Sequence, residues 1–469
     1  MKRFAITFTA LISCLSFSFP IFGAYTSRVI TLEQAISLAL QNDPWLHGSE
    51  LKQKAAIYRS SAARTWSSPK VSLNMMNLPT NSWSFDQEAM TQVNVGVSQV
   101  LPRGNSLAIK ESQLKIEASK FALLRDDRIA RLKTIVSELW LDAYLAQQTI
   151  ALIESDRMLF EQMAEVARAS YSSALGNMRQ QDVIRAELEI IQLEDRVVSQ
   201  KQLLESATAQ LSEWFHLYDN ETQGDNFNFN SPSLSFSVAE TLPAIELAVP
   251  EAVDIPSYVR ERMAQILVTH PALKAIEQKR KVFEKSTELA RQQYKPQWGV
   301  NASYGYRDDM QSGQSRADFF SVGVSFDVPL FTQNRQDKEV AASIADSQAV
   351  KTEKLLLTKQ MLSALETEIR QLVRLRERQT LYKQGILLQT NEQAEASLTA
   401  YTNDDGDFSE VVRARIAVLN AQISALRIDV DALKTVARIN YFFADSKAEL
   451  TNSAVNHTAF GAASQMGEK

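Results

Sequence analysis

Few residues of this chain could do chemistry. Its only cysteine is Cys14, and its four histidines are scattered over the sequence, at His47, His216, His270 and His457. We find no His-Glu-x-x-His, no Gly-x-Ser-x-Gly and no phosphate-binding glycine loop. The carboxylates stand beside lysine or arginine at helical spacing, as Glu111 does beside Lys115, which is typical of a solvated coiled-coil surface. The sequence therefore predicts a protein that is not an enzyme and has no cofactor and no resident metal ion.

Three methionines offer a further chemical possibility. Met75, Met76 and Met90 lie in or beside a segment whose alternation predicts a β-hairpin. Thioether sulfur binds soft cations such as Cu(I), so these residues could hold such a cation. Methionines at strand positions also fill space against lipid or a protein core, so both interpretations stay open.

The composition excludes some classes of protein. The 469 residues carry a formal net charge of -5, so the chain offers no basic surface for nucleic acid. No stretch after residue 25 reaches the ~20 apolar residues of a membrane-spanning helix. At the start, Lys2 and Arg3 precede an apolar run that ends before Gly23 and Ala24, the order of a secretory signal peptide. We expect residues 1–24 to be that signal, with an uncleaved anchor or acylation of Cys14 as the alternatives.

An internal repeat organises the rest of the chain. At an offset of 227 residues Pro44 falls on Pro271, and further matches are Pro69 with Pro296, Pro102 with Pro329, and Val95-Gly96-Val97-Ser98 with Val322-Gly323-Val324-Ser325. The segment from Asp182 to Ala186 matches the segment from Glu410 to Ala414 at an offset of 228. We therefore divide the chain into a first copy, 25–215, a linker that packs as a collar, 216–258, a second copy, 259–445, and a disordered tail, 446–469.

Each copy predicts short helices, then a β-hairpin, then long helices. The hairpins, at about 70–101 and 297–329, alternate apolar with small polar residues. Their strands of about 9–11 residues are long enough for a tilted bilayer crossing. Aromatic side chains suited to a membrane interface are Trp298, Tyr304, Tyr306 and Phe320. A β-sandwich could alternate in the same way, but the strand lengths and the aromatics favour a membrane barrel.

The long helices form two rods that run out and back. Because these stretches contain no proline, we expect helices at 106–172, 182–215, 336–400 and 410–443. Apolar residues recur every seven positions, as in Leu107 and Leu114, which predicts coiled coils. Each rod turns at a Tyr-x4-Gly sequence, which begins at Tyr171 in one rod and at Tyr401 in the other. We expect Gly176 and Gly406 to end their helices in the left-handed conformation.

Four membrane strands cannot pair their own outer edges, and in lipid every backbone group must be paired within the protein. Two chains would give eight strands with a filled interior, and three would give twelve with room for a lumen. The predicted fold class is therefore mainly α with a β-barrel part. It is a tandem-duplicated protomer of a homotrimer with a 12-stranded transmembrane β-barrel, and its long α-helical coiled coils form a ring that can surround a channel.

The chain resembles the TolC-type outer-membrane efflux and secretion channels over about residues 29–443. The motifs that carry the resemblance are Leu32-Glu-Gln-Ala35, Asn42-Asp43-Pro44, Ser98-Gln-Val-Leu-Pro102, and a Tyr-x4-Gly turn followed by Asp182-Val-Ile. The resemblance implies a Gram-negative outer-membrane channel subunit of a tripartite efflux system that conducts passively, with a 12-stranded β-barrel that continues into a long α-helical coiled-coil tunnel across the periplasm. Its implied partners are two further copies, outer-membrane lipid, a periplasmic adaptor and an inner-membrane pump of the RND or ABC type. The stretch Asp86-Gln-Glu-Ala-Met-Thr91 and the sequence Leu-Pro-Arg-Gly look like the heavy-metal branch.

The resemblance also assigns roles at the rod tips. Acidic residues constrict the periplasmic entrance in relatives, and Glu410 takes the position of one of them, while Arg413 stands where a second acid is often found. Further candidates for this entrance are Asp182, Asp404, Asp405 and Asp407. A solvated, helix-terminating loop is the alternative reading of these acids. The candidate adaptor contacts are Tyr171, Gly176, Tyr401 and Gly406.

Three other functions fit parts of the pattern. A type I secretion channel would have the same architecture and a different cargo. A trimeric coiled-coil adhesin or structural stalk would have one terminal barrel, whereas here hairpins interrupt the helices twice. A soluble periplasmic coiled-coil binding module would be released as mature protein without detergent.

Overall fold

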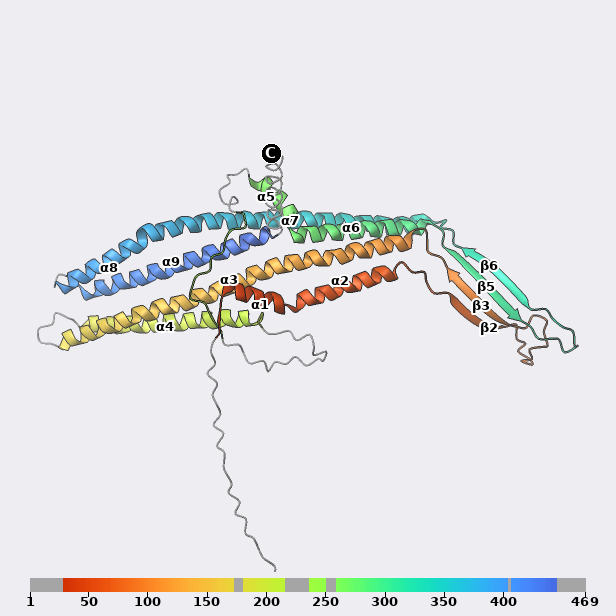
Figure 1. Ribbon diagram of the computed structural model, residues 1–469, viewed down its shortest axis with the longest axis horizontal. Helices are drawn as coiled ribbons and strands as arrows, with labels where there is room; N and C mark the ends of the chain where they lie inside the picture. Colours follow the sequence, from red (N-terminus) through yellow and green to blue (C-terminus); the bar gives the residue numbers. More distant parts are fainter. Residues whose placement is uncertain (1–27, 173–179, 216–235, 250–258, 404–405, 445–469) are drawn as a thin grey trace, which may run out of the picture.

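The computed structural model describes residues 28–172, 180–215, 236–249, 259–403 and 406–444. These residues form an elongated molecule in which long helices lie side by side and one sheet stands at their end (Figure 1). Among the described residues, no helix is both long enough and apolar enough to cross a membrane. Most of the described chain is helical, as predicted.

The first copy begins with two short helices that are capped by their own side chains. Helix α1 is Leu32–Asn42 and helix α2 is Pro44–Ala62. Thr31 forms a capping box with Gln34, with a distance of 3.3 Å from the Gln34 backbone nitrogen to Thr31 Oγ1. Asp43 accepts from the Trp45 backbone nitrogen at 3.1 Å and pairs with Arg128 Nε at 2.8 Å. The buried Asp43 carboxylate thus ties the start of α2 to the long helix.

The rest of the first copy follows the predicted order. Strands β2, Lys70–Met76, and β3, Gln92–Val100, precede helix α3, Ser106–Ser172, and helix α4, Gln180–Ser212. Helix α3 has the range expected from the absence of glycine and proline. Its 67 residues correspond to a rod of about 100 Å.

The second copy repeats this order with one difference. Its elements are α5, Val259–Val268, α6, Pro271–Arg291, η2, Gln292–Tyr294, β5, Trp298–Tyr306, β6, Phe319–Phe326, η3, Thr332–Asn334, α7, Gln336–Leu381, η4, Tyr382–Ile386, α8, Leu387–Thr402, and α9, Phe408–Phe442. The helix expected at 336–400 is present, but it contains a π-helical turn, η4, that the sequence did not predict. A π-turn keeps the chain helical, so composition alone did not reveal it.

Three large apolar clusters lie along the rods, and a small fourth cluster of Ala394, Ala414 and Val418 joins α8 to α9. One joins α5, α6, α7 and α9, with Leu267, Leu365 and Leu372 among its most buried members. A second, around Trp140, joins α1, α3 and α4 near the middle of the molecule. The third holds α3, α4 and α9 together towards the tips, with Phe160 at its centre. Because α9 of the second copy contributes to the clusters of α3 and α4, the two copies pack against each other along the rods.

A small parallel sheet was not expected from the sequence. Strand β1, Arg28–Ile30, pairs with β4, Phe236–Val238, which belongs to the linker. Trp140 Nε1 donates to the Ile30 carbonyl at 3.0 Å, and Gln147 Nε2 donates to the Val238 carbonyl at 3.1 Å. The described part of the linker thus packs on the helices near their midpoint.

Candidate functional site

The four long strands form one antiparallel sheet in the order β2-β3-β5-β6. The seam between β3 and β5 joins the hairpin of the first copy to that of the second. Strands β2 and β6 are the outer edges and have no further strand beside them among the described residues. Strands β3 and β5 contain nine residues each, within the 9–11 expected, whereas β2 has seven and β6 has eight. Strand β2 ends at Met76, before Asn77, whose φ of 55° belongs to a turn.

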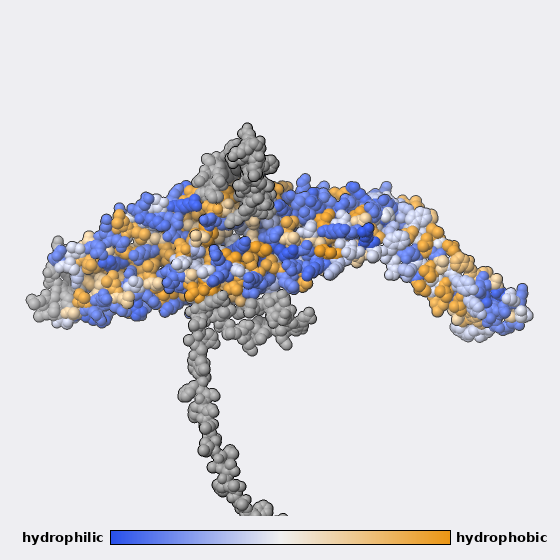
Figure 2. Space-filling model, viewed as in Figure 1, coloured by the Kyte–Doolittle hydropathy of each residue, from blue (hydrophilic) through white to orange (hydrophobic). Residues whose placement is uncertain are grey.

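One face of this sheet is apolar and exposed. The pairing places Val71 beside Val97, Leu73 beside Val95, and Tyr304 beside Phe320. Leu73 is 74% exposed and Phe320 is 72% exposed. Figure 2 shows apolar residues gathered over this end of the molecule. A monomer in water would lose stability by exposing such a surface, which is typical of contact with lipid or another protein.

The opposite face carries glycine and small polar side chains. Ser72 pairs with Gly96, and Asn301 pairs with Gly323. A Cβ atom on Gly96 would lie 2.8 Å from Ser72 Oγ, and one on Gly323 would lie 2.7 Å from Asn301 Oδ1. Each of these glycines therefore makes room for the polar side chain on the neighbouring strand. Lys70 is the only charged residue within the four strands and lies on this face, whose other polar side chains are uncharged.

A polar joint connects the sheet to the rods. Arg103 Nη1 donates to the Lys295 carbonyl at 2.9 Å and to Asp327 Oδ1 at 3.2 Å. Asp327 Oδ1 also accepts from the Gln297 backbone nitrogen at 2.5 Å. Asp327 directly follows β6, so its carboxylate fastens the end of that strand to this joint. Three of the connections between strands and helices are thereby held together.

The methionines do not form a common site. Met75 pairs with Val93 on the apolar face, whereas Met76 pairs with Gln92 on the polar face. The Met76 sulfur accepts from Gln92 Nε2 at 3.8 Å. Met90 lies outside the strand, and its side chain is exposed. In the parts of the chain that the structure describes, no group of three histidine, cysteine, aspartate or glutamate side chains could hold a metal ion.

The α8–α9 tip is a compact turn. Asp407 caps α9 by accepting from the Ser409 backbone nitrogen at 3.1 Å. The rings of Tyr401 and Phe408 pack edge to face at 5.8 Å, and Phe408 is buried. Asp407 therefore has a structural role as a cap, beside any effect of its charge on an entrance.

Gly406 is needed for a reason that differs from the expected one. We predicted a left-handed glycine, and this was wrong, because Gly406 is not among the glycines with positive φ. A Cβ atom there would lie 2.7 Å from the Tyr401 backbone nitrogen and 2.9 Å from the Ala400 carbonyl carbon. Close approach of the backbone to the end of α8 is what excludes a side chain.

The other tip candidates have different environments. Glu410 and Arg413 are exposed near the start of α9. Asp182 is buried in the first turn of α4, with 7% of its surface exposed, and Tyr171 is exposed at 52%. Gly176, Asp404 and Asp405 lie outside the described residues. The tips of α3–α4 and of α8–α9 lie at the same end of the molecule, opposite the sheet (Figure 1).

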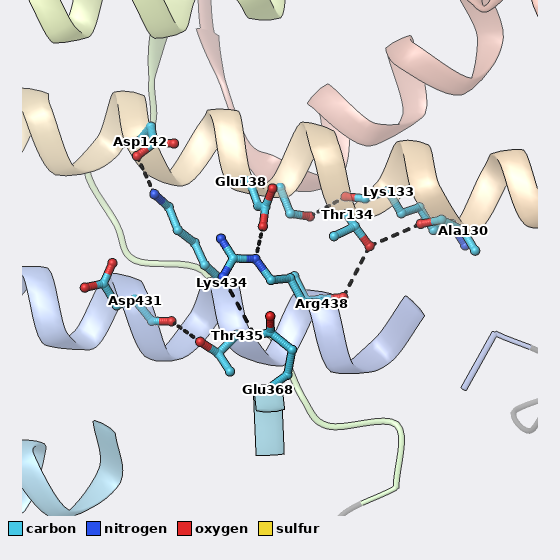
Figure 3. A network of polar contacts seen from close by, with 12 residues as sticks. Ala130, Lys133, Thr134, Glu138, Asp142, Glu368, Asp431, Lys434, Thr435 and Arg438 are labelled. Atoms are coloured by element: carbon cyan, nitrogen blue, oxygen red, sulfur yellow. Dashed lines mark hydrogen bonds and ion pairs between the residues drawn. The ribbon is translucent and has the colours of Figure 1, made fainter. Parts of the chain in front are cut away.

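An unpredicted ion-pair network links the two copies near the middle of the rods (Figure 3). Arg438 on α9 contacts Glu138 on α3, and its Nη1 atom lies 3.7 Å from Glu368 Oε2 on α7. Lys434, one turn earlier, contacts Asp142 on α3. Burial raises the pKa of Glu368, and Arg438 opposes this shift. The partners are about 300 and 70 residues apart in sequence, so no local pattern could identify them.

Solved outer-membrane channels have the same architecture. The outer-membrane channel OprN is 15% identical, with a TM-score of 0.69 over 88% of this chain and 89% of that chain. The outer membrane protein VceC from Vibrio cholerae is 14% identical, with a TM-score of 0.68 over 88% of this chain and 96% of that one. CusC is 13% identical, with a TM-score of 0.66 over 89% and 93% of the two chains. No protein-family model and no curated protein matches.

These similarities define the class of structure. The chain has the fold of an outer-membrane channel protomer, which is the fold that the TolC-type resemblance predicted.

Proposed function

We propose that this chain is the subunit of a homotrimeric outer-membrane channel in a Gram-negative tripartite efflux system, where it conducts substrates passively through the outer membrane and the periplasm. One observation carries the proposal. A four-stranded sheet with an exposed apolar face ends at two edges, β2 and β6, that have no partner strand among the described residues. In lipid such edges must be paired, and neighbouring subunits can pair them.

A barrel of three subunits would give each face of the sheet a suitable environment. Twelve strands would turn the apolar face to lipid and the glycine-rich polar face to a lumen. The rods would continue this lumen as a tunnel on the periplasmic side. The α3–α4 and α8–α9 tips, at the far end, are then the parts that meet a periplasmic adaptor and, through it, an inner-membrane pump of the RND or ABC type.

The internal repeat predicts how neighbouring subunits pair. The offset of 227 maps β3 onto β6 and β5 onto β2, so the edge between two subunits would be equivalent to the β3–β5 seam within one. In that seam Val97 faces Ala302. Their counterparts are Val324 and, in the neighbouring subunit, Met75. Both side chains belong to the apolar face, so this register continues the face without a break.

A disulfide test follows from this register. We expect the double variant Val324→Cys and Met75→Cys to form covalent dimers and trimers when outer membranes are oxidised, and reductant should reverse this. Within one subunit the two positions are separated by β3 and β5, about 14 Å at 4.8 Å per strand, which is too far for a disulfide. The matched control is Val324→Cys with Asn74→Cys, because Asn74 lies on the polar face.

The outcome separates the channel from its rivals. A monomer on the denaturing gel, together with protein that is soluble without detergent, would refute the channel and support a soluble coiled-coil module. The cargo is a separate question. Because Met75 and Met76 lie on opposite faces, the sheet gives no support for metal export. A deletion strain tested for sensitivity to copper, dyes, detergents and antibiotics would assign the cargo.

A further inference from the structure

The π-turn η4 distinguishes the second rod from the first. Helix α3 runs without interruption, whereas η4 separates α7 from α8. Short π-helical turns within α-helices are rare and are frequent at functional sites.

The offset between matching buried positions of the two rods changes at η4. Before the π-turn, five buried residues of α7 match five buried residues of α3 at a constant offset of 229. The pairs are Met361 with Leu132, Leu365 with Val136, Ile369 with Trp140, Leu372 with Ala143, and Leu375 with Ala146. After the π-turn, buried Ala394 matches buried Ala164 at an offset of 230. Tyr401 and Gly406 match Tyr171 and Gly176 at the same offset of 230.

We infer that the second rod contains one inserted residue, that η4 absorbs it, and that η4 is a hinge for α8. An extra residue in a continuous α-helix would rotate everything beyond it by about 100° and move it by about 1.5 Å. Ala394 and Tyr401 would then face the wrong way. The wider π-turn takes up the residue and keeps both side chains in phase with the first rod.

The packing around η4 defines what can move. The apolar cluster that holds α7 includes Leu375 and, beside it, the half-buried Tyr382. The next buried residue along the rod is Ala394, which forms a small cluster with Ala414 and Val418. Within the described chain, no side chain between these points is buried. Beyond this cluster, α8 contacts the rest of the subunit through the Glu395–Arg415 ion pair and, at its far end, through the partly buried Tyr401. Helix α8 is therefore held by fewer buried side chains than α9.

Helix α9 is held much more firmly than α8. Its residues Phe408, Val412 and Leu419 are buried in the cluster formed with α3 and α4. It also fixes the upper side of the hinge, because Asp429 accepts from Gln379 Nε2 at 2.7 Å and lies 3.6 Å from Lys383 Nζ. At Gly385, inside the π-turn, an added Cβ would meet nothing within 4 Å, so there is space for bending. Thus α8 pivots at η4 while α9 stays with the α3–α4 pair.

The hinge has a role if the proposed function holds. The far end of α8 carries Tyr401 and leads into the turn with Asp407 and Glu410. Movement of α8 would shift Tyr401 relative to Asp407 and Glu410, which stay with α9, and would change the width of the tunnel entrance. An adaptor that grips this tip would then need to displace one helical arm and not a packed pair of helices.

Removal of one residue tests the inference. We expect deletion of Gly385 to convert η4 into ordinary α-helix with all side chains still in phase, so that the trimer folds with unchanged yield. The control is deletion of Ser155, an exposed residue of α3, which has no π-turn to remove. That deletion should turn Phe160, Ala164 and Ala167 out of their cluster and reduce the yield of folded protein.

Hydrogen exchange on the full-length, detergent-solubilised protein measures the hinge directly. We expect amides of 387–402 to exchange about tenfold faster than those of 408–425 in the wild type, because local opening follows sparse packing. Deletion of Gly385 should remove most of this difference. The inference is overturned if this deletion misfolds as the Ser155 deletion does, or if α8 and α9 exchange equally in the wild type. Neither result depends on channel activity, so failure of the hinge and failure of the channel are distinguishable.

Discussion

The substitution Gly406→Ala should destabilise the α8–α9 tip. The added Cβ would lie 2.7 Å from the Tyr401 backbone nitrogen and 2.9 Å from the Ala400 carbonyl carbon. These are backbone atoms, so the last turn of α8 must unwind or shift. We expect a cost of about 1–3 kcal/mol, the usual range for forcing atoms into a packed site. Loss of the Tyr401–Phe408 ring contact would add about 0.5–1.5 kcal/mol.

Gly48→Ala is the matched control, because the same change there should have the opposite sign. Gly48 lies within α2, and a Cβ would meet nothing within 4 Å. Alanine should stabilise that helix by about 0.5–1 kcal/mol. Thermal unfolding of the detergent-solubilised protein measures both variants, and limited proteolysis reports whether residues 400–408 have opened. Equal stability of the two variants, with an intact tip, would refute the close-approach argument. The larger Gly406→Val should in addition abolish export while the trimer remains.

Two further predictions concern ion pairs on the rods. Hydrogen bonds from Arg280 and Lys354 lower the pKa of Glu277 from 4.5 to about 2, so the ionised carboxylate stabilises the folded state above pH 4.5 and this contribution is lost as the pH falls towards 2. Between pH 5 and pH 2 the free energy of unfolding, measured by thermal unfolding, should fall by about 1 kcal/mol from this carboxylate. Glu277→Gln should remove this part of the pH dependence, and a variant with the wild-type pH profile would contradict the assignment. Arg438→Met should cost about 1–3 kcal/mol, because it leaves Glu138 and Glu368 without their cation. The loss should be smaller at pH 5 than at pH 8, because burial raises the pKa of Glu368, and a loss independent of pH would argue against the network.

The sequence predicted the elements that have strong local signals. Thr31 and Gln34 form a recognisable capping box, and the proline-free, glycine-free stretch from 106 to 172 could only be a long helix. The strand faces followed from strict alternation, as in Val93 to Ser98. In each case neighbouring residues carry the information, so no tertiary contact was needed to identify the element.

The features that the sequence missed depend on distant residues or on a single position. Strands β1 and β4 are three residues each, too short to show a period, and they pair across about 200 residues. The π-turn results from one residue, which is visible only when the buried positions of both rods are aligned. The role assigned to Gly406 was wrong, because a glycine that ends a helix reads the same in sequence whether it supplies positive φ or close approach.

The candidate site was predictable only in part. Alternation identified the two faces of the sheet, but the joint formed by Arg103 and Asp327 links residues that lie 224 apart in sequence. The same applies to Arg438 and Glu138, which are 300 residues apart. The roles of Asp182, Glu410 and Arg413 at an entrance stay predictions, because one subunit does not contain the neighbours that would complete it.

The two ends of the described part of the linker contact different copies. Val238 is buried in the cluster around Trp140, whereas Ala248 donates its backbone N–H to Asn440 Oδ1 of α9 at 2.7 Å. Between them Glu240, Thr241 and Leu242 are exposed. Each half of the subunit therefore holds its own end of the connection, and a break in the gene at this point would leave these contacts intact. Two separately encoded half-subunits could therefore assemble through the same contacts. The proposed trimer then corresponds to a ring of six repeat copies, which the linkers join in pairs.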